Sequence, residues 1–515
     1  MKKSVYFPLL SAVACSGFAG CSTGTDKPRQ PNIVFILADD IGYGDLSSYG
    51  SVKIQTPHTD RVAAAGVAFM NAHSVAATST PSRYALLTGE YAFRRNDTGV
   101  AAGNAPSIIK PEQKTLPAML QAAGYTTAAI GKWHLGLGAN TSQNWNDYVS
   151  PGPGELGFDY SYIMSATGDR VPCVYMENQR IVSLDPSDPV EVSYTTPFPD
   201  EPLGSTHPEL LTKLRPSHGH DMAIVNGISR IGYMKGGKQA LWVDEFIADS
   251  ITSKAVAFIE RNKDKPFFLY WGSNDPHVPR WPNPQFVGKT GMGPRGDAVV
   301  QFDWSVGQII DALERNGLLD NTIVIITSDN GPVLDDGYQD QAVELNGGHK
   351  AWGPLRGGKY SAFEAGTRVP FIVSWPKGGV PKGKKSYTPI SHIDFFASMA
   401  ALTGQTLDDD AAPDSFDQIR TWLGHDEKGR DYVIKQAGAT LSLIEGDWKY
   451  IAPSSRDNPY LAHVDIESGY ITQPQLYNLK DDIGERNNLA AEHPDKVEKL
   501  AALVKWARNT PETRK

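Results

Sequence analysis

Residues 32–40 read NIVFILADD, a run of large apolar side chains that ends in two aspartates. An apolar run without polar alternation is typical of a strand that is covered on both faces. Similar runs occupy residues 125–130, 266–271, 322–327 and 369–375. Helical patterns lie between them, at residues 115–123, 246–261, 301–316 and 391–403. This alternation predicts an α/β fold with a large, mostly parallel sheet sandwiched by helices.

Two regions depart from this pattern. From about residue 430 the chain changes to short polar-apolar strands at 432–436, 441–444, 448–451 and 475–479, followed by an amphipathic helix at 494–508. We therefore predict a main domain over 31–425 and a smaller C-terminal α+β subdomain of antiparallel strands over 426–515. Residues 145–245 are rich in glycine, proline and aromatic residues and only weakly periodic, which predicts a long insertion or lid where specificity resides.

Within the main domain, Ser391 and Asp394 are spaced as a capping box for the helix at 391–403.

The N-terminus resembles an export signal. Lys2 and Lys3 precede an apolar run at 5–14, and small residues follow up to Cys21. The sequence Phe-Ala-Gly-Cys ending at Cys21 resembles a bacterial lipobox, in which the cysteine is lipidated. Cys15 is a weaker candidate, and an ordinary signal peptide is the alternative. We expect a signal peptide over 1–21, a tether over 22–30, and an exported lipoprotein of the periplasm, outer membrane or cell surface that touches the membrane only through its lipid.

Composition excludes several classes of protein. Of 515 residues, 40% are hydrophobic and 21% charged, which argues against a disordered tail protein, a coiled coil and a polytopic membrane protein. The net charge of −9 argues against nucleic-acid binding and, taken alone, against a polyanionic substrate. Three cysteines allow no disulfide framework and no CxxC site, so Cys173 is expected to be a small buried hydrophobe.

Reactive side chains follow four of the predicted strands. The groups are Asp39-Asp40, Lys132 with His134, the segment 274–277 that ends in His277, and Asp329-Asn330. Ligands of open α/β sheets bind beyond the carboxyl ends of the strands, so these groups are expected at one sheet edge. For one aspartate pair alone, an Asx turn or a helix cap is an equal alternative. Two such pairs favour a metal site, and their oxygen donors suit calcium or magnesium rather than zinc.

Residues 79–89 read STPSRYALLTG. Pro81 suits a first helical turn and Gly89 suits a helix end. Ser79 would then lie at a helix N-terminus, where an anion is favoured, with Arg83 on the same side of the helix. Taken alone, this segment is equally well explained as a capped helix.

These motifs together resemble those of the sulfatase family. The segment from Ser79 to Gly89 is similar to the sulfatase signature, in which a cysteine or serine is followed by x-Pro-x-Arg and then by Thr-Gly. Further similar motifs follow in the family's order, at residues 32–40, 131–136, 276–279, 328–331, 355–359 and 476–489. Each motif is weak alone, but their order is specific. The resemblance covers nearly the whole mature chain and implies an alkaline phosphatase-like fold.

The resemblance implies a type I, serine-type sulfatase. In such enzymes the signature residue is oxidised to formylglycine (3-oxoalanine), whose hydrate attacks sulfur, and here that residue would be Ser79. The serine form implies maturation by a radical-type formylglycine-generating enzyme. An unmodified serine would remain trapped as a sulfate ester. One calcium ion would be bound by Asp39, Asp40, Ser79, Asp329 and Asn330.

The same resemblance assigns the remaining catalytic roles. Arg83 would orient the hydrate, while Lys132 and Lys359 would bind sulfate oxygens and neutralise their charge. His277 would bind substrate and protonate the leaving alcohol, with help from Lys359, and His134 would act as the base of the second half-reaction. For either histidine alone, a hydrogen-bonded loop residue is the plain alternative.

Two other functions compete with a sulfatase. A metal-dependent phosphatase or phosphodiesterase of the alkaline phosphatase superfamily would use unmodified Ser79 and zinc. Zinc needs nitrogen ligands, and Asn330 stands where such enzymes commonly place a histidine. An inactive glycan-binding lipoprotein is expected to lack the nucleophile or metal ligands, whereas this sequence has them all.

The expected substrate is a sulfated glycan. Residues 167–175 and 215–221 look like a carbohydrate-active branch of the family that removes O-sulfate from galactose or N-acetylgalactosamine. Asp169 and Arg170 would hold sugar hydroxyls by bidentate hydrogen bonds. His218 and His220 lack a third ligand nearby and are interpreted as hydrogen-bonding loop residues rather than a metal site. The net charge of −9 then excludes only a broad polyanion-binding surface and is compatible with a narrow basic pocket.

Overall fold

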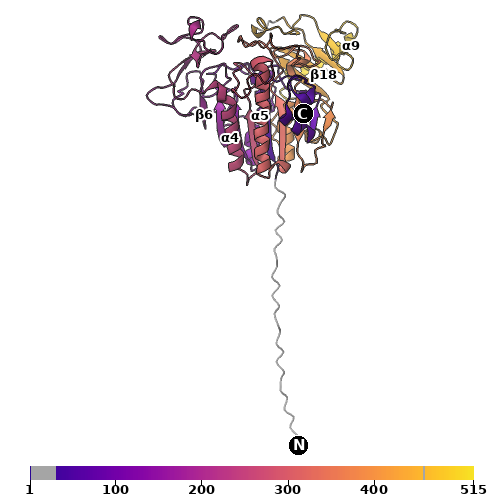
Figure 1. Ribbon diagram of the computed structural model, residues 1–515. Coiled ribbons are helices and arrows are strands. Elements are labelled where there is room, and N and C mark those ends of the chain that lie inside the picture. The colour runs from indigo at the N-terminus through magenta and orange to yellow at the C-terminus, as the bar shows by residue number, and fades with distance from the viewer. Residues whose placement is uncertain (2–29, 456–458, 515) are drawn as a thin grey trace.

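The computed structural model describes residue 1, residues 30–455 and residues 459–514. Cys21, the signal segment and all but the last residue of the tether lie outside the described residues. Of the helices in the described part of the chain, none is both long and apolar enough to cross a membrane. Figure 1 shows a large body of helices and strands with the C-terminal residues at its upper edge.

The main sheet has ten strands in the order β15-β2-β14-β13-β1-β12-β4-β5-β6-β7. Their bounds are β15 Lys384–Ser386, β2 Val67–Phe69, β14 Phe371–Ser374, β13 Thr322–Ser328, β1 Asn32–Ala38, β12 Phe267–Gly272, β4 Thr126–Lys132, β5 Tyr160–Met164, β6 Tyr175–Glu177 and β7 Arg180–Ile181. The central strands from β13 to β5 run parallel, as predicted. β14 pairs with β13 in the antiparallel sense, because the chain crosses the carboxyl edge between the two strands and enters β14 from that edge.

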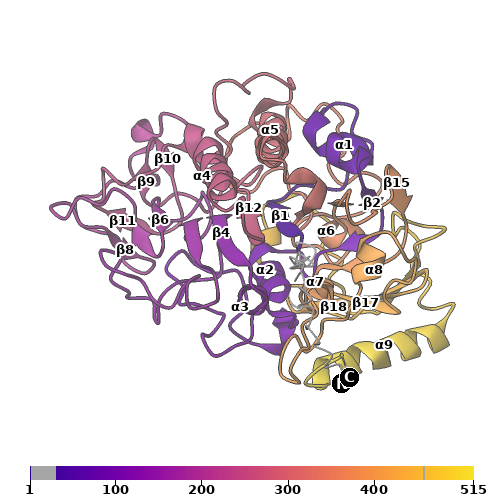
Figure 2. The ribbon, with the colours of Figure 1, turned by 90° about the horizontal axis from the view of Figure 1, so that it is seen from below.

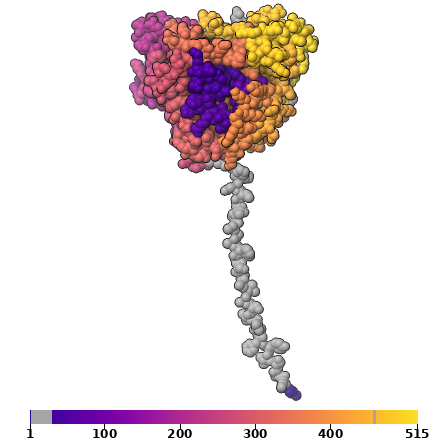
Figure 3. All heavy atoms as spheres, turned by 45° about the vertical axis from the view of Figure 1, so that its right-hand side comes forward, coloured from indigo at the N-terminus to yellow at the C-terminus, as the bar shows by residue number. Residues whose placement is uncertain are grey.

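Helices cover both faces of this sheet (Figure 2). One face carries α1 (Pro57–Ala64), α4 (Ile247–Arg261) and α5 (Gly293–Arg315), and the other carries α2 (Ser79–Thr88), α3 (Leu116–Ala122) and α7 (Phe395–Leu402). Every residue of β1 is buried, so the strand that opens the fold lies at the centre of the core. In the space-filling view, early residues (indigo) fill the surface between pink and orange segments, so parts distant in sequence form one body (Figure 3).

Two helix predictions need correction. α5 begins at Gly293 rather than near residue 301, and its first turns bury Arg295 and Asp297, whose charges hide the apolar pattern. The capping-box prediction is wrong: Ser391 makes no cap hydrogen bond and a 3₁₀ turn follows it, His392–Asp394. The carboxylate of Asp394 instead accepts hydrogen bonds from the Arg430 guanidinium at 2.5 Å and the Phe416 backbone N–H at 2.8 Å.

The long insertion is mostly irregular, but part of it extends the sheet. β5, β6 and β7 lie at one edge, and short strands follow at β8 Glu191–Ser193, β9 Ile224–Val225, β10 Ile228–Ser229 and β11 Tyr233–Lys235. Cys173 is fully buried and free, as expected for a small hydrophobe.

The C-terminal unit is a four-stranded antiparallel sheet, as predicted, with helix α9 (Pro494–Asn509) against it. The strands are β17 Tyr432–Ala437, β18 Thr440–Glu445, β19 Trp448–Ile451 and β20 Gln475–Asn478. Gln436 of β17 donates its N–H to Val75 O at 3.0 Å and accepts from Ala77 N–H at 2.8 Å. The C-terminal sheet therefore holds the chain just before α2 begins. The short helices α6 (Glu364–Thr367) and α8 (Ile419–Trp422) and the short strands β3 (Ala72–His73) and β16 (Ile390–Ser391) complete the fold.

Candidate active site at the carboxyl edge of the sheet

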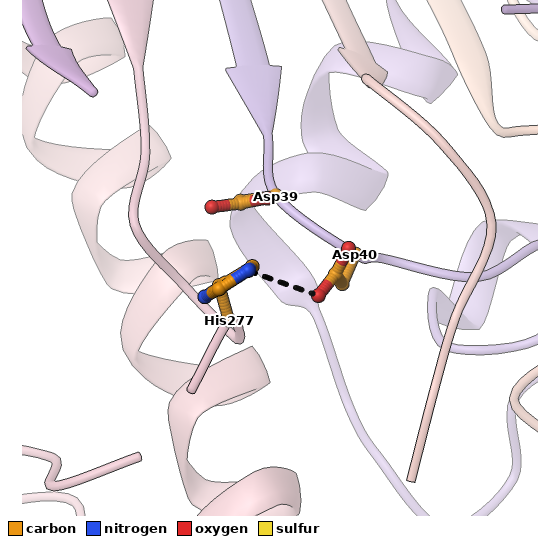
Figure 4. A group of neighbouring side chains, drawn as sticks. All are labelled: Asp39, Asp40 and His277. Carbon is orange, nitrogen blue, oxygen red and sulfur yellow. Dashed lines mark ion pairs between the residues drawn. The ribbon is translucent and has the colours of Figure 1, made fainter. Parts of the chain in front are cut away.

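Asp39 and Asp40 follow the last residue of β1, and both side chains are buried (Figure 4). Successive side chains of an extended chain point to opposite sides, but Asp40 has a left-handed backbone, with φ 64°. This turn allows both carboxylates to face the same space, together with His277. Ligand atoms of the three residues lie within 4.8 Å of one another.

Asp329 and Asn330 arrive beside this pair because β1 and β13 end at the same level, with Ala38 opposite Ser328. The Asp40 N–H donates to Asp329 Oδ1 at 3.4 Å. Asn330 Nδ2 donates to Asp40 Oδ1 at 2.7 Å. Because β1 and β13 are parallel and end at the same level, the pairs Asp39-Asp40 and Asp329-Asn330 meet although they are far apart in the sequence.

Ser79 is the first residue of α2 and is 4% exposed. Its hydroxyl lies 3.4 Å from both Asp39 Oδ1 and Asn330 Oδ1, and accepts a hydrogen bond from Lys132 Nζ at 3.0 Å. One turn later, Arg83 holds Asp329 Oδ2 through Nε and Nη2 at 3.0 and 2.9 Å, and its Nη1 donates to the Lys132 carbonyl at 3.0 Å. Arg83 therefore joins α2 to the ends of β13 and β4.

Lys132 is the last residue of β4, and its ammonium lies 2.6 Å from Asp39 Oδ2. Gly131 allows the close approach of β4 to β12, because it has a φ of +97° and a Cβ there would lie 1.9 Å from the Gly272 carbonyl. His134 is buried two residues later, with Nε2 at 3.0 Å from Ala101 O and Nδ1 without a partner among the described residues.

Lys359 and His277 close the opposite side. Lys359 Nζ lies 2.8 Å from both Asp40 Oδ2 and Asp336 Oδ2. His277 Nδ1 is 2.7 Å from the Val278 carbonyl, so Nδ1–H donates there, and Nε2 lies 3.9 Å from Asp40 Oδ2. Burial, followed by the charge of Lys359, lowers the pKa of His277 well below its usual value.

The charges at this edge do not balance. Four carboxylates, Asp39, Asp40, Asp329 and Asp336, face three cations, Arg83, Lys132 and Lys359. Burial and repulsion from Asp329 and Asp40 raise the pKa of Asp39 well above its usual value, against the attraction of Lys132. Burial opposes the charge of Asp329 too, but Arg83 and Lys132 outweigh it and lower its pKa. Buried oxygen donors with one surplus negative charge fit a hard divalent cation, which would leave one positive charge for an anion.

A cavity of about 260 Å³ opens above these residues. Ser79, His134, His277 and Lys359 line it together with Asp169 and Arg170 from the insertion. Asp169 is held by Arg170 Nη1 at 2.8 Å and by His220 Nε2 at 3.0 Å, and these two residues outweigh burial and lower its pKa. The sequence-predicted catalytic and substrate residues therefore line one pocket, apart from Arg83 and Lys132, and Lys132 reaches it through its hydrogen bond to Ser79.

The histidine pair of the insertion does not form a metal site. Among the described residues, the cluster whose acidic and imidazole ligand atoms are close enough for an ion is Asp39 with Asp40 and His277. His220 hydrogen-bonds to Asp169, as interpreted from the sequence, and His218 stacks on His463 with ring centroids 4.9 Å apart.

Sequence reasoning missed part of the pocket. Asp336 pairs with Lys359 and accepts a hydrogen bond from the Tyr360 hydroxyl at 2.9 Å, yet it follows no strand and resembles any acidic loop residue. Tyr460 and His463 line the cavity from the loop between β19 and β20 of the C-terminal unit. No pattern in the sequence links this loop to the sheet edge, about 400 residues away from β1 along the chain.

Comparison with known proteins agrees with this geometry. The Sulfatase family model matches residues 31–405. An N-acetylgalactosamine-6-O-sulfatase of Bacteroides thetaiotaomicron is 50% identical over 504 residues, which cover 96% of this chain and 97% of the relative. Human N-acetylgalactosamine-6-sulfatase is 32% identical over 405 residues, covering 77% of this chain and 66% of the relative.

A solved structure from a study of glycosaminoglycan metabolism by Bacteroides thetaiotaomicron superposes with a TM-score of 0.91 at 50% identity, over 94% of this chain and 100% of that one. Residues 31–425 are about three quarters of the chain, so a match over 94% of it also extends into the C-terminal unit. The chain therefore belongs to the sulfatase family.

Proposed function

We propose that this enzyme removes the 6-O-sulfate of N-acetylgalactosamine residues in glycans. The proposal rests on the two relatives named for that reaction, which span most of this chain. It also rests on the pocket, whose cationic end has room for a sulfate group and whose other end carries Asp169 and Arg170. A paired carboxylate and guanidinium suit the hydroxyls of a sugar. Galactose 6-sulfate differs only at position 2 and is the second candidate.

Membership of the sulfatase family implies, in general, a metal ion and a formylglycine. We propose that the ion is calcium, bound by Asp39, Asp40, Asp329 and Asn330 together with residue 79. Three carboxylates and an amide oxygen suit calcium, since magnesium keeps several waters and zinc prefers nitrogen ligands. When bound, the ion would polarise a sulfate oxygen, and formylglycine at residue 79 would supply the attacking hydroxyl.

The cations of the site prepare it for sulfate. Lys132 and Lys359 are each held by a buried carboxylate, so both ammonium groups are already ordered: Lys359 lines the pocket, and Lys132 lies beneath it against the Ser79 hydroxyl. Arg83 fixes Asp329 and the end of β4 and, through α2, the position and orientation of residue 79. Together these contacts place positive charge where the sulfate oxygens gain negative charge during the reaction.

The two histidines are proposed as acid and base. The Nδ1–H of His277 donates to the Val278 carbonyl, which directs Nε2 towards the pocket. The negative charge of a bound sulfate group would favour the imidazolium form, whose Nε2–H can protonate the leaving alcohol. Lys359 lies on the same side and shares this task. The buried Nδ1 of His134 has no partner among the described residues and is free to take a proton during sulfate release.

The competing functions fit the site less well. A zinc phosphatase would require nitrogen ligands, but Asn330 supplies an oxygen where a histidine is needed. A binding protein without activity has no use for a nucleophile position, a full ligand set and two histidines in one pocket. Neither nucleic acid nor a broad polyanion is expected as a partner of a protein with a net charge of −9.

We further propose that the chain is exported, lipidated at Cys21 and matured by a radical-type enzyme that oxidises Ser79. It would then act in the periplasm or at the outer membrane or cell surface, tethered only by its lipid. Labelling of cells with a radioactive fatty acid checks the anchor: the Cys21→Ser protein is expected to lose the label and the Cys15→Ser protein to keep it. The opposite pattern would move the anchor to Cys15.

A substrate panel tests the proposed activity. The matured enzyme is expected to release sulfate from 6-O-sulfated N-acetylgalactosamine faster than from the 4-O-sulfated isomer, and a calcium chelator should stop the reaction. Comparison with the rate on galactose 6-sulfate measures how much the acetamido group of the sugar contributes. Release of phosphate by zinc-loaded protein with intact Ser79, or turnover of aryl sulfates alone, would contradict the proposal.

A further inference from the structure

A second cavity, of about 400 Å³, adjoins the sulfate pocket. The His463 side chain lines both cavities. Along the chain, Asp336 lines the first cavity and its neighbour Asp335 lines the second. The two cavities are therefore neighbours. The chain at Asp335 and Asp336 lies between them on one side, and the His463 imidazole lies between them on the other.

The divider between the cavities is held in place from both sides. His463 stacks on His218, and His218 Nδ1 lies 3.9 Å from Asp335 Oδ1. The Ser217 hydroxyl donates to the same carboxylate at 2.7 Å. The insertion, the segment after β13 and the C-terminal loop meet at this point, so a ligand that passes His463 would contact all three.

The volumes of the two cavities indicate that a glycan occupies both. Pockets for drug-sized ligands measure about 300–1,000 Å³, so the first cavity, at about 260 Å³, has room for one sulfated sugar and little more. The second cavity, at about 400 Å³, has room for another sugar ring. A sugar that enters the first cavity sulfate-first would carry its glycosidic neighbour towards His463, the residue that both cavities share.

The second cavity has the lining that a pyranose requires. Trp352, Leu355 and Ile466 give it an apolar wall, against which the C–H face of a sugar ring can pack. Asp335 and Asp465 add carboxylates that accept hydrogen bonds from hydroxyls. A mainly apolar wall with a few fixed polar groups is the usual composition of a small-ligand site.

Charge selects the kind of sugar. The guanidinium groups of Arg356 and Arg486 both pair with Glu467, Arg486 at 2.8 Å. With Asp335 and Asp465 also lining the cavity, its carboxylates outnumber its guanidinium groups. Among the described residues that line it, this cavity therefore has one surplus negative charge, which disfavours a uronate or a second sulfate. The first pocket differs, because Lys359 lines it and Lys132 lies directly beneath it.

We propose that the second cavity is a subsite for an uncharged sugar attached to the sulfated residue. This subsite rests on the proposed function and makes it more specific: the preferred substrate is an oligosaccharide with a neutral neighbour rather than the sulfated monosaccharide. The subsite would contribute to binding of the longer substrate and would be empty when the monosaccharide is bound.

Kinetics of a blocked variant test the subsite. Val343 lines the second cavity and is 55% exposed, so Val343→Trp adds bulk there without disturbing the core. The native enzyme is expected to show kcat/KM about tenfold higher for a neutral disaccharide than for the monosaccharide. The variant should lose that advantage and keep its monosaccharide kcat/KM within about twofold. Asp465→Asn should reduce the disaccharide advantage about threefold.

Val287→Trp is the matched control, since Val287 is 64% exposed and lines neither cavity. Equal kcat/KM for mono- and disaccharides in the native enzyme, or an advantage that survives in Val343→Trp, would overturn the subsite. A larger advantage for a uronic-acid neighbour would overturn its neutral character. Inactivity on every sulfated sugar would instead contradict the proposed function, so the two failures are distinguishable.

Discussion

The proposed active site consists of two regions that are built in different ways. The site floor comprises Asp39, Asp40, Ser79, Lys132, Asp329, Asn330 and Lys359, all buried and most of them at the ends of parallel strands. The pocket rim comprises Asp169, Arg170, His218, His220, Tyr460 and His463, which come from irregular segments. Ion pairs join the strand ends of the floor to one another, whereas the rim combines the pairs of Asp169 with Arg170 and His220 with stacked rings and loop contacts.

This difference separates chemistry from selectivity. The floor positions charge around residue 79, and its geometry follows from the sheet, which every sulfatase substrate would encounter in the same form. The rim surrounds the part of the substrate that varies, and its loops can change without moving a strand. We therefore expect floor variants to lose turnover with every substrate, and rim variants to lose it only with sugars.

The largest effect is expected from Asp39→Asn. Asp39 contacts both Lys132 and Ser79, and it is a proposed calcium ligand. Loss of its charge should reduce kcat by about 10³-fold or more on both sulfated sugars and a small aryl sulfate. Assays with both substrates, together with bound calcium measured by atomic emission, check the result. Full activity without bound calcium would contradict the role of the floor.

A smaller and selective loss is expected from Asp169→Asn. The carboxylate of Asp169 is held by Arg170 and His220 at the sugar end of the pocket. Its replacement should lower kcat/KM for the sulfated sugar by about 10²-fold, the cost of removing hydrogen bonds from a charged group. The kcat/KM for an aryl sulfate should change by less than about threefold. Equal losses of kcat/KM on both substrates would contradict a selective role and show that Asp169 behaves like the residues of the floor.

Asp45→Asn gives a contrasting effect on stability rather than on catalysis. Asp45 is buried, pairs with Arg295 at 2.8 Å and His349 at 2.8 Å, and does not line the pocket. Loss of one partner of a buried pair costs about 3–5 kcal/mol. We expect a lower denaturation midpoint at pH 7, with unchanged turnover per folded molecule at low temperature. The variant thus serves as the buried-aspartate control for Asp39→Asn.

The pH dependence of this effect follows from the pKa of Asp45. Burial opposes its charge, but Arg295 and His349 outweigh burial and lower the pKa to about 2. The unfolded chain protonates this carboxyl near pH 4, so its contribution to stability is complete above that pH and is lost as the pH falls towards 2. The difference in midpoint between native and variant proteins should therefore shrink over that interval. A constant difference would contradict the ion-pair explanation.

The sequence was sufficient to predict the floor, because its residues lie at strand ends that any parallel sheet brings together. Asp39 and Asp329 are 290 residues apart, yet Ala38 and Ser328 are neighbours in register. Ser79 and Lys359 were the exceptions: neither follows a strand, and the family resemblance pointed to both. The structure then showed how Asp336 holds Lys359.

The rim could be predicted only in part, for a physical reason. Asp169 and Arg170 were found because they resembled a family segment, but Tyr460 and His463 reach the pocket through a loop of the C-terminal unit. Their position depends on how β17 pairs with residues 75–77 and on the packing of two units, which no local periodicity encodes. The start of α5 was missed for a related reason, since Arg295 is buried by pairing with Asp45 rather than by being apolar.

The account depends most on residue 79. The enzyme should be produced in two preparations, with and without a radical-type maturation enzyme. For each preparation, mass spectrometry of the peptide that contains Ser79 and the rate of sulfate release should both be measured. We predict a peptide lighter by two hydrogens in the matured sample, with turnover proportional to the converted fraction. Equal turnover from protein whose Ser79 is entirely unmodified would contradict the account.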